Sequence, residues 1–326
     1  MSYVVARQEL ADLREEWLLL LNGGRAAKVF QHPVWQQIWL EEFGGDRQPL
    51  LLSVRDGARL LAVVPLLREG TRLSLIGDHN ICDYMDFVMA PGEEKESLSA
   101  LLDALQGEDW TELELRGLAA GSPTLALLPS LAGDRGLEVR VEREAVCPQL
   151  DLPSTWEDYL AQLGKKNRHE LKRKMRRLNN TAVGVRLLTL RTPPEVGEGM
   201  DTFLRLMTLK SDKAQFMTPQ MERFFRRAAV ALAEEGLVAL YMLEMDGRRV
   251  ASALCFEDEN EILLYNSGYD PELSYLSIGL ISKALVLRSA IEEGRRHLDF
   301  LRGNEPYKYD LGGRDVEVHR CLIRRL

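Results

Sequence analysis

The stretch Leu237-Val-Ala-Leu-Tyr-Met-Leu-Glu-Met-Asp-Gly-Arg-Arg-Val-Ala-Ser-Ala-Leu-Cys-Phe256 consists of two apolar runs on either side of Asp246-Gly247. An Asp-Gly pair between such runs indicates a β-hairpin, because both residues accept the positive φ that a tight turn requires. The pattern continues with a strand at 261–267, a loop at 268–271, a helix at 279–293 and a strand that ends in Asp299-Phe-Leu-Arg-Gly303. Hairpin, strand, helix and strand together predict an α+β lobe rather than a doubly wound fold.

The same order of elements occurs earlier in the chain. Pro49-Leu-Leu-Leu-Ser-Val-Arg-Asp-Gly-Ala-Arg-Leu-Leu-Ala-Val-Val-Pro-Leu66 is again two apolar runs around an Asp-Gly pair. A strand at 72–76, a loop at 83–86, a helix at 93–105 and a strand ending in Leu113-Glu-Leu-Arg-Gly117 follow. The shared order and the shared Leu-Arg-Gly ending predict two related lobes, residues 1–150 and residues 151–326.

The composition argues against several classes of protein. The 326 residues carry a formal net charge of -8, which disfavours binding of the whole protein to nucleic acid or an anionic membrane. The four cysteines lie far apart without a Cys-x-x-Cys pair, so we expect reduced thiols, no metal site and a cytoplasmic location. Residues 1–8 lack a basic stretch before an apolar run, and we expect no signal peptide and no membrane span. Neither a Walker-type loop nor a dinucleotide fingerprint occurs.

The segment between the third strand and the helix of the second lobe is a candidate anion site. It reads Asn266-Ser-Gly-Tyr-Asp-Pro-Glu-Leu-Ser-Tyr-Leu-Ser-Ile-Gly-Leu280, with Ser277 as a possible N-cap and Gly279 at the helix start. Free backbone N–H groups and the positive end of the helix dipole favour a phosphate there. A Ser-capped helix without a ligand would have the same sequence.

The two lobes differ at this position. The helix of the first lobe opens with Pro91-Gly-Glu-Glu-Lys-Glu96, whose carboxylates would repel a phosphate. The second lobe has no acidic residue between Glu272 and Glu292. We therefore expect only the second lobe to hold an anionic cofactor.

A polar loop follows the last strand of the repeat. It reads Arg302-Gly-Asn-Glu-Pro-Tyr-Lys308, and loops beyond strand ends commonly carry function. Lys308 could stabilise an oxyanion formed when an amine attacks a thioester, and Glu305 could accept a proton from that amine. A solvated loop with internal ion pairs is the competing interpretation.

The segment 165–178 carries eight Lys and Arg residues against one Glu, and its apolar residues recur on one helical face. It is either a solvated face or a positive surface for an anionic partner. That partner could be the CoA 3′-phosphate, a tRNA, or an acidic glycan or lipid.

Several motifs in order resemble the BioF2-like acetyltransferases, which include CelD-type proteins named for cellulose biosynthesis and are related to the FemABX aminoacyltransferases. The motifs are Ser267-Gly-Tyr-Asp-Pro271, Tyr275-Leu-Ser-Ile-Gly279, Asp299-Phe-Leu-Arg-Gly-Asn-Glu-Pro-Tyr-Lys308 and Phe30-Gln-His-Pro-Val-Trp35. The resemblance implies two tandem GNAT-like lobes, each a mixed twisted sheet flanked by helices. It also implies an acyl-CoA co-substrate, acetyl-CoA in the first place, and transfer of the acyl group to an amine of a small molecule or a cell-envelope or polysaccharide precursor.

The resemblance also implies roles for particular residues. The CoA pyrophosphate would bind at Ser277, Ile278, Gly279 and Leu280. Lys308, Glu305 and Tyr307 would be catalytic, and Arg302 and Asn304 would contact the acceptor. In the first lobe, which would have no donor site, Asp83, Tyr84 and Asp86 could recognise hydroxyl or amino groups of the acceptor.

Two residues depart from the pattern of the family. Ile278 stands where Pro is common, and Asn304 stands where Asp is common, which shifts the role of base towards Glu305. FemABX relatives use an aminoacyl-tRNA donor, so a tRNA-dependent transferase is one alternative, although no coiled-coil arm accompanies the basic segment. A catalytically inactive binding protein is another.

Overall fold

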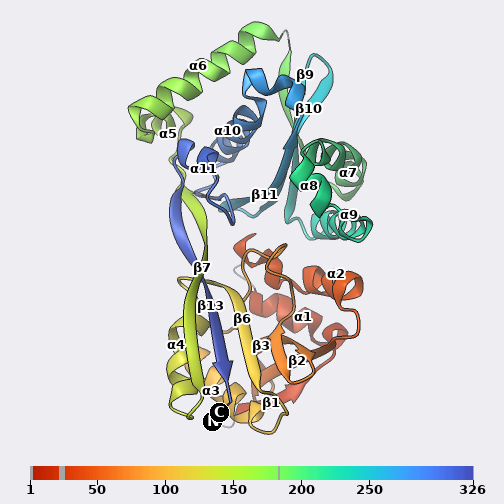
Figure 1. The fold of residues 1–326 in the computed structure, drawn as a ribbon, viewed down its shortest axis with the longest axis vertical. Coiled ribbons are helices and arrows are strands. Elements are labelled where there is room, and N and C mark those ends of the chain that lie inside the picture. The colour runs from red at the N-terminus through yellow and green to blue at the C-terminus, as the bar shows by residue number, and fades with distance from the viewer. Residues whose placement is uncertain (1–2, 22–25, 183, 326) are drawn as a thin grey trace. The chain divides into compact units, whose positions relative to one another are not determined.

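The computed structural model describes residues 3–21, 26–182 and 184–325, which form two compact units (Figure 1). Unit 1 contains residues 28–146 together with the N-terminal segment and Val316–Leu326, and unit 2 is built mainly of Cys147–Asp315. The last strand, which we had expected in the second lobe, thus clusters with unit 1. The reason is that it pairs with a strand of that unit.

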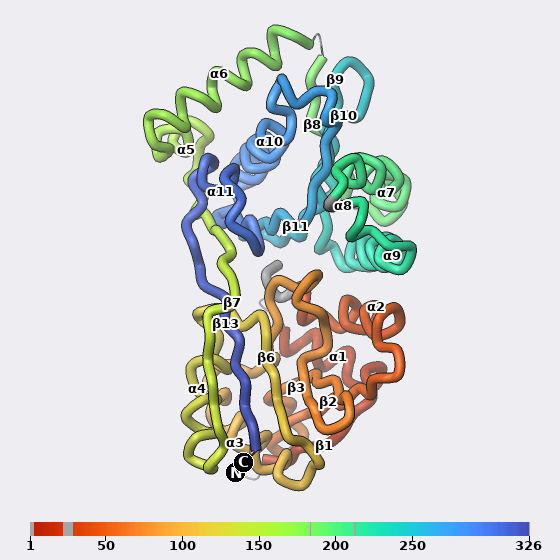
Figure 2. Tube along the Cα trace, viewed as in Figure 1, coloured from red at the N-terminus to blue at the C-terminus, as the bar shows by residue number. Residues whose placement is uncertain are grey.

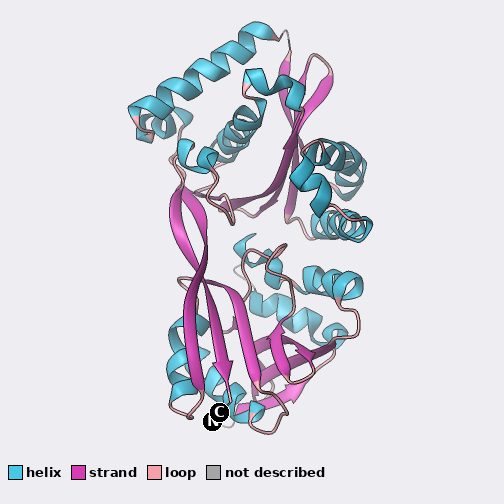
Figure 3. Cartoon of the chain, viewed as in Figure 1, coloured by secondary structure: helices cyan, strands magenta, loops and turns pink. Residues whose placement is uncertain are grey.

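The strands of unit 1, magenta in Figure 3, form a mixed sheet. Their hydrogen-bonded order is β1-β2-β3-β4-β6-β13. β4 runs parallel to β6, whereas the pairs β1–β2, β2–β3, β3–β4 and β6–β13 are antiparallel. The short strand β5 pairs with β3. The bounds are β1 Tyr3–Arg7, β2 Gln48–Asp56, β3 Arg59–Glu69, β4 Arg72–Leu75, β5 Val88–Met89, β6 Glu112–Ala119 and β13 Arg314–Arg324.

The helices of unit 1 are α1 Leu10–Leu21, α2 Pro33–Phe43, α3 Glu94–Leu105 and α4 Pro123–Gly133, with a 3-10 helix at Ala26–Gln31. Trp17 of α1 packs with Leu51 of β2 and Val63 of β3 in a buried cluster. Burial of such apolar side chains is the main source of stability for a unit of this size.

Unit 2 repeats this arrangement with the order β8-β9-β10-β11-β12-β7. β11 runs parallel to β12, while β7, which continues from unit 1, pairs antiparallel with β12 through residues 149–151. The bounds are β7 Glu138–Asp151, β8 Val185–Leu190, β9 Val238–Met245, β10 Arg248–Glu257, β11 Glu261–Tyr269 and β12 His297–Asp299.

Helices cover both faces of the sheet in unit 2. Figure 2 traces α7, α8 and α9 on one side, and α5, α6, α10 and α11 on the other. Their bounds are α5 Trp156–Gln162, α6 Lys165–Thr181, α7 Pro193–Thr208, α8 Ser211–Phe216, α9 Pro219–Glu234, α10 Ile278–Glu292 and α11 Pro306–Asp310, with a 3-10 helix at Pro271–Leu276. Gly268 lets α7 approach β11 closely, because a Cβ atom there would lie 2.3 Å from the backbone nitrogen of Met207.

The predicted repeat is confirmed element by element. Both Asp-Gly pairs close antiparallel hairpins, β2–β3 and β9–β10. In each unit the third strand leads through a loop and a helix into a parallel neighbour. The prediction of a mixed α+β fold is therefore correct.

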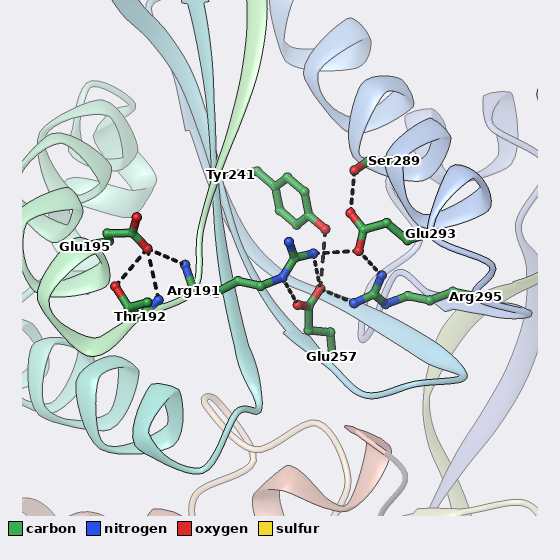
Figure 4. Close-up of polar contacts among 8 residues, drawn as sticks. All are labelled: Arg191, Thr192, Glu195, Tyr241, Glu257, Ser289, Glu293 and Arg295. Atoms are coloured by element: carbon green, nitrogen blue, oxygen red, sulfur yellow. Dashed lines mark hydrogen bonds and ion pairs between the residues drawn. The ribbon is translucent and has the colours of Figure 1, made fainter.

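A network of ion pairs ties the elements of unit 2 together at the end of β10 (Figure 4). The carboxylate of Glu257, which is buried, lies 2.8 Å from Arg295 and also pairs with Arg191. Arg191 reaches Glu293 at 2.7 Å, and Tyr241 donates to Glu257 at 3.4 Å. Because each buried charge has a partner of opposite sign, the cluster links β8, β9, β10 and α10 without an uncompensated charge.

No helix among the described residues is both long enough and apolar enough to cross a membrane. The basic segment forms α6, whose Leu171 and Leu178 are buried while Lys172, Arg173 and Arg176 are exposed. The expected amphipathic helix is therefore present.

Candidate functional site

A cavity of about 380 Å³ opens in unit 2 where β11 ends and α10 begins. It brings together residues that are distant in the sequence, from the start of α8, from β11, from the 3-10 helix and α10 that follow it, and from the start of α11. The lining residues are Lys210, Lys213, Ser267, Tyr269, Ser274, Ser277, Ile278, Gly279, Leu280, Lys283, Glu305 and Tyr307. All four residues predicted for the pyrophosphate, and two of the three predicted catalytic residues, therefore line one cavity.

The first turn of α10 lines this cavity and contains backbone donors without a backbone partner in the described part of the chain. Ser277 has a left-handed conformation with φ of 59°, and its carbonyl accepts from the N–H groups of Leu280 and Ile281 at 3.0 Å. In the described part of the chain, the N–H groups of Ile278 and Gly279 donate no backbone hydrogen bond. The expected side-chain cap from Ser277 is not formed, so these donors are left for a ligand.

Gly279 is needed for a reason that the sequence did not reveal. A Cβ atom at this position would lie 2.6 Å from the ring of Tyr269, which packs against the start of α10. The absence of a side chain at Gly279 therefore accommodates an aromatic ring of β11 and not simply a ligand.

Three lysines that sequence analysis missed also line the cavity. Lys210 lies over the ring of Tyr269, 4.6 Å from its centroid. Lys213 donates to Asn266 Oδ1 at 2.8 Å and to the carbonyl of Ser267 at 2.6 Å. Lys283 projects from α10, donates to the carbonyl of Gly279 at 2.9 Å and lies 4.8 Å from the ring of Tyr307.

Lys283 is the most unusual of the three, because it is only 6% exposed. Burial, with the like charges of Lys213 and Lys210 adding to it, lowers the pKa of Lys283 to about 7. One sequence signal could have revealed it. α10 is apolar almost all round, and a helix of that kind is buried, so a lysine in its second turn must enter the interior of the unit.

The polar loop 302–308, which ends in the first turn of α11, places Glu305 and Tyr307 in the cavity but turns Lys308 away from it. The ammonium of Lys308 is buried and donates to the carbonyls of Leu301, Arg302 and Gly303 at 2.8 to 3.1 Å. It also lies 3.0 Å from Glu305 Oε2. Lys308 thereby organises the loop, and its predicted role of stabilising an oxyanion stays a prediction.

The remaining residues of this loop do not line the cavity. Asn304 is exposed, and Arg302 is partly buried. Burial raises the pKa of Tyr307, so the phenol keeps its proton at neutral pH.

Asp86, one of the candidate acceptor residues, has hydrogen-bond partners within unit 1. Asp86 accepts from Ser122 Oγ at 2.5 Å and from the N–H of Phe87 at 2.7 Å, and Ser122 in turn caps α4. Tyr84 is buried, and Asp83 is partly buried. These contacts define a local structural role for Asp86, while the predicted contact with an acceptor stays a prediction.

Comparison with known proteins is consistent with this geometry. Residues 165–309 match the model of the acetyltransferase (GNAT) domain family. A search of curated proteins finds no match. Among solved structures, FemX aligns with a TM-score of 0.69 at 13% identity, covering 98% of this chain and 97% of its own.

Two further structures align over nearly the whole chain. A tandem GNAT protein from the clavulanic acid biosynthesis pathway covers 98% of both chains, with a TM-score of 0.50 at 15% identity. A conserved protein of unknown function from Bacteroides thetaiotaomicron covers 99% of this chain and 100% of its own, with a TM-score of 0.59 at 13% identity. At such identities the alignments establish the fold alone.

The protein therefore shares the fold of FemX and of a tandem GNAT protein over nearly its whole length. Residues 165–309 match the GNAT acetyltransferase domain family, as the resemblance in the sequence implied.

Proposed function

We propose that the protein transfers an acyl group from acyl-CoA, in the first place acetyl-CoA, to an amine of a small molecule or of a cell-envelope or polysaccharide precursor. The observation that carries the proposal is the start of α10. Two unpaired N–H groups, at Ile278 and Gly279, meet three lysines in one cavity, and the first turn of the helix has no acidic residue. A diphosphate is the natural ligand of such a site.

Two residues at the start of α11, Glu305 and Tyr307, supply the proton transfers. The amine nitrogen attacks the thioester carbonyl, and the C–N bond forms as the C–S bond breaks. Glu305 accepts the proton that the amine loses. Tyr307 gives a proton to the departing thiolate and regains one from solvent.

Thermal melting with acyl-CoA tests the donor. We expect CoA and acetyl-CoA to raise the melting temperature of the wild-type protein, since ligands that bind the folded state stabilise it. Ser274→Glu should abolish this shift, because Ser274 is exposed at the cavity and the new carboxylate repels the diphosphate. Ser274→Glu disturbs the helix less than a change at Gly279, where any side chain would meet Tyr269.

A matched control uses an exposed serine far from the cavity in the sequence. Ser130→Glu on α4 introduces the same charge and should leave the shift unchanged. If no CoA ester shifts the melting temperature of the wild type at millimolar concentration, the proposed donor is wrong. If a CoA ester does bind, release of free CoA thiol in the presence of a panel of amines identifies the acceptor.

A second candidate is transfer from an aminoacyl-tRNA, and the observation that favours it is α6. Eight Lys and Arg residues lie on this helix against the single carboxylate of Glu170, which pairs with Arg173 and Lys174. Salt-sensitive tRNA binding that is lost when Lys172, Arg173 and Arg176 are changed to Gln would support it. Binding that is indifferent to these changes, or no binding at all, would exclude it.

A further inference from the structure

The charges around the cavity do not balance. Its lining carries three ammonium groups, from Lys210, Lys213 and Lys283, and one carboxylate, from Glu305. That carboxylate is already paired with the buried ammonium of Lys308. The cavity therefore presents an excess of positive charge to whatever enters it.

Lys283 is the most deeply buried of the charged groups that line the cavity. In the described part of the chain its ammonium makes no ion pair, and its partners are the carbonyl of Gly279 and the ring of Tyr307. A buried ammonium without a counter-ion is costly, because neither a neutral carbonyl nor a ring replaces the water that it has lost. A ligand that brings a negative charge would remove that cost.

Lys283 and the N–H groups that suit a diphosphate are distinct parts of the cavity wall. Those N–H groups lie in the first turn of α10, at Ile278 and Gly279. The ammonium of Lys283, one turn further along the chain, donates to the carbonyl of Gly279 and lies 4.8 Å from the ring of Tyr307 of α11. Lys213 contacts the carbonyl of Ser267 near the end of β11. These two cations therefore belong to the part of the cavity that β11 and α11 form, where Glu305 and Tyr307 would act.

We propose that Lys213 and Lys283 form a subsite for a carboxylate carried by one of the two reactants. The proposal rests on the proposed acyl-CoA function and narrows its substrate class. The carboxylate belongs either to the acyl group, as in a dicarboxylic acyl-CoA, or to the acceptor, as in an amino acid. The exposed Lys210 lies at the same cavity and adds to the attraction for anions.

The donor arm of the test compares ligands that differ by one carboxylate. Dissociation constants of CoA, acetyl-CoA and succinyl-CoA are measured by calorimetry at about pH 6.5, where Lys283 is charged. If the acyl group carries the anion, wild type should bind succinyl-CoA about tenfold more tightly than acetyl-CoA. Lys283→Met should abolish this preference, and Lys283→Arg should retain part of it.

The acceptor arm uses acetyl-CoA as donor. The KM of lysine is compared with that of 1,5-diaminopentane, which has the same amines without the carboxylate. If the acceptor carries the anion, the KM of lysine should be about tenfold lower, and Lys283→Met should remove the difference. The melting temperature of each variant establishes that it is folded.

The outcomes separate this inference from the proposed function. A preference for the carboxylate in either arm that Lys283→Met abolishes supports the inference and identifies the source of the anion. Binding of acetyl-CoA with no preference in either arm overturns the inference and leaves the proposed function intact. If Lys283→Met weakens the binding of CoA, acetyl-CoA and succinyl-CoA equally, Lys283 interacts with the diphosphate, and the inference of a carboxylate subsite is also overturned. If no CoA ester binds, both the proposed function and the carboxylate subsite are wrong.

Discussion

At the scale of single residues, the buried lysine of α10 departs most from what the sequence suggests. Lys283 has a pKa of about 7 against a usual value of 10.5, because burial and two neighbouring lysines disfavour its charged form. Between these two pH values the unfolded chain binds a proton that the folded chain does not. The wild type therefore gains stability as the pH rises from 7 to 10 and is penalised at pH 7 and below.

Lys283→Met should remove this penalty. At pH 7 the free energy of unfolding of the variant should exceed that of the wild type by roughly a few kcal/mol. The difference should shrink towards pH 10. Urea unfolding of both proteins at the two pH values measures it, and other titrating groups cancel in the comparison. The ionisable groups near Lys283 that stay present in both proteins include Lys210, Lys213, Glu305, Cys255 and Tyr307.

An exposed lysine provides the control for this experiment. Lys172→Met on α6 should change stability little, and equally at both pH values. A difference between Lys283→Met and wild type that does not vary with pH would show that Lys283 is not held in the interior with a lowered pKa.

At the scale of elements, a glycine of β11 and a glycine of α7 differ in what surrounds them. A Cβ atom at Gly268 of β11 would meet the backbone of Met207, at 2.3 Å, and a backbone cannot move aside cheaply. A Cβ atom at Gly197 of α7 would lie 3.7 Å from the side chain of Val230, which is an ordinary contact.

Substitution by alanine should therefore have opposite effects at these glycines. Gly268→Ala should lower the free energy of unfolding by about 1–3 kcal/mol, because α7 must shift from β11. Gly197→Ala should raise it by about 0.5–1 kcal/mol through helix propensity alone. Chemical unfolding of the two variants measures both effects, and a neutral Gly268→Ala would contradict the close packing.

At the scale of the whole molecule, the repeat raises the question of how many donors the chain binds. The helix at the equivalent position in unit 1 is α3, which has Glu93 at its N-cap position and Glu94 and Glu96 in its first turn. These carboxylates already interact with the positive end of the helix dipole and would repel a diphosphate. α10 in unit 2 has no acidic residue in its first turn.

We therefore expect one acyl-CoA to bind per chain. Titration calorimetry with acetyl-CoA should give a stoichiometry of about one, and Ser274→Glu in unit 2 should eliminate the binding rather than halve it. A stoichiometry of about two, with one site surviving Ser274→Glu, would show that unit 1 also binds the donor.

Much of the fold could be predicted from local patterns. The two Asp-Gly hairpins, the order of elements after them and the contrast between the two helix starts all depend on residues close together in the chain, and period and turn chemistry reveal such features directly. The placement of β13 could not be predicted in this way. Its pairing with β6 joins residues 318–324 to residues 112–119, and no local pattern encodes that choice of partner.

The candidate site also has features that local sequence predicts and features that only tertiary packing creates. The sequence by itself determined that a glycine-containing, acid-free helix start and a polar loop follow one another in the second lobe, because both are contiguous motifs. Only the tertiary structure decided that Lys210 and Lys213 meet Lys283 in the same cavity, and that Lys308 turns inward to the carbonyls of its own loop. The physical reason is that the environment of a charged side chain, and with it the pKa and the partners, is set by the elements that pack around it, and these come from distant parts of the chain.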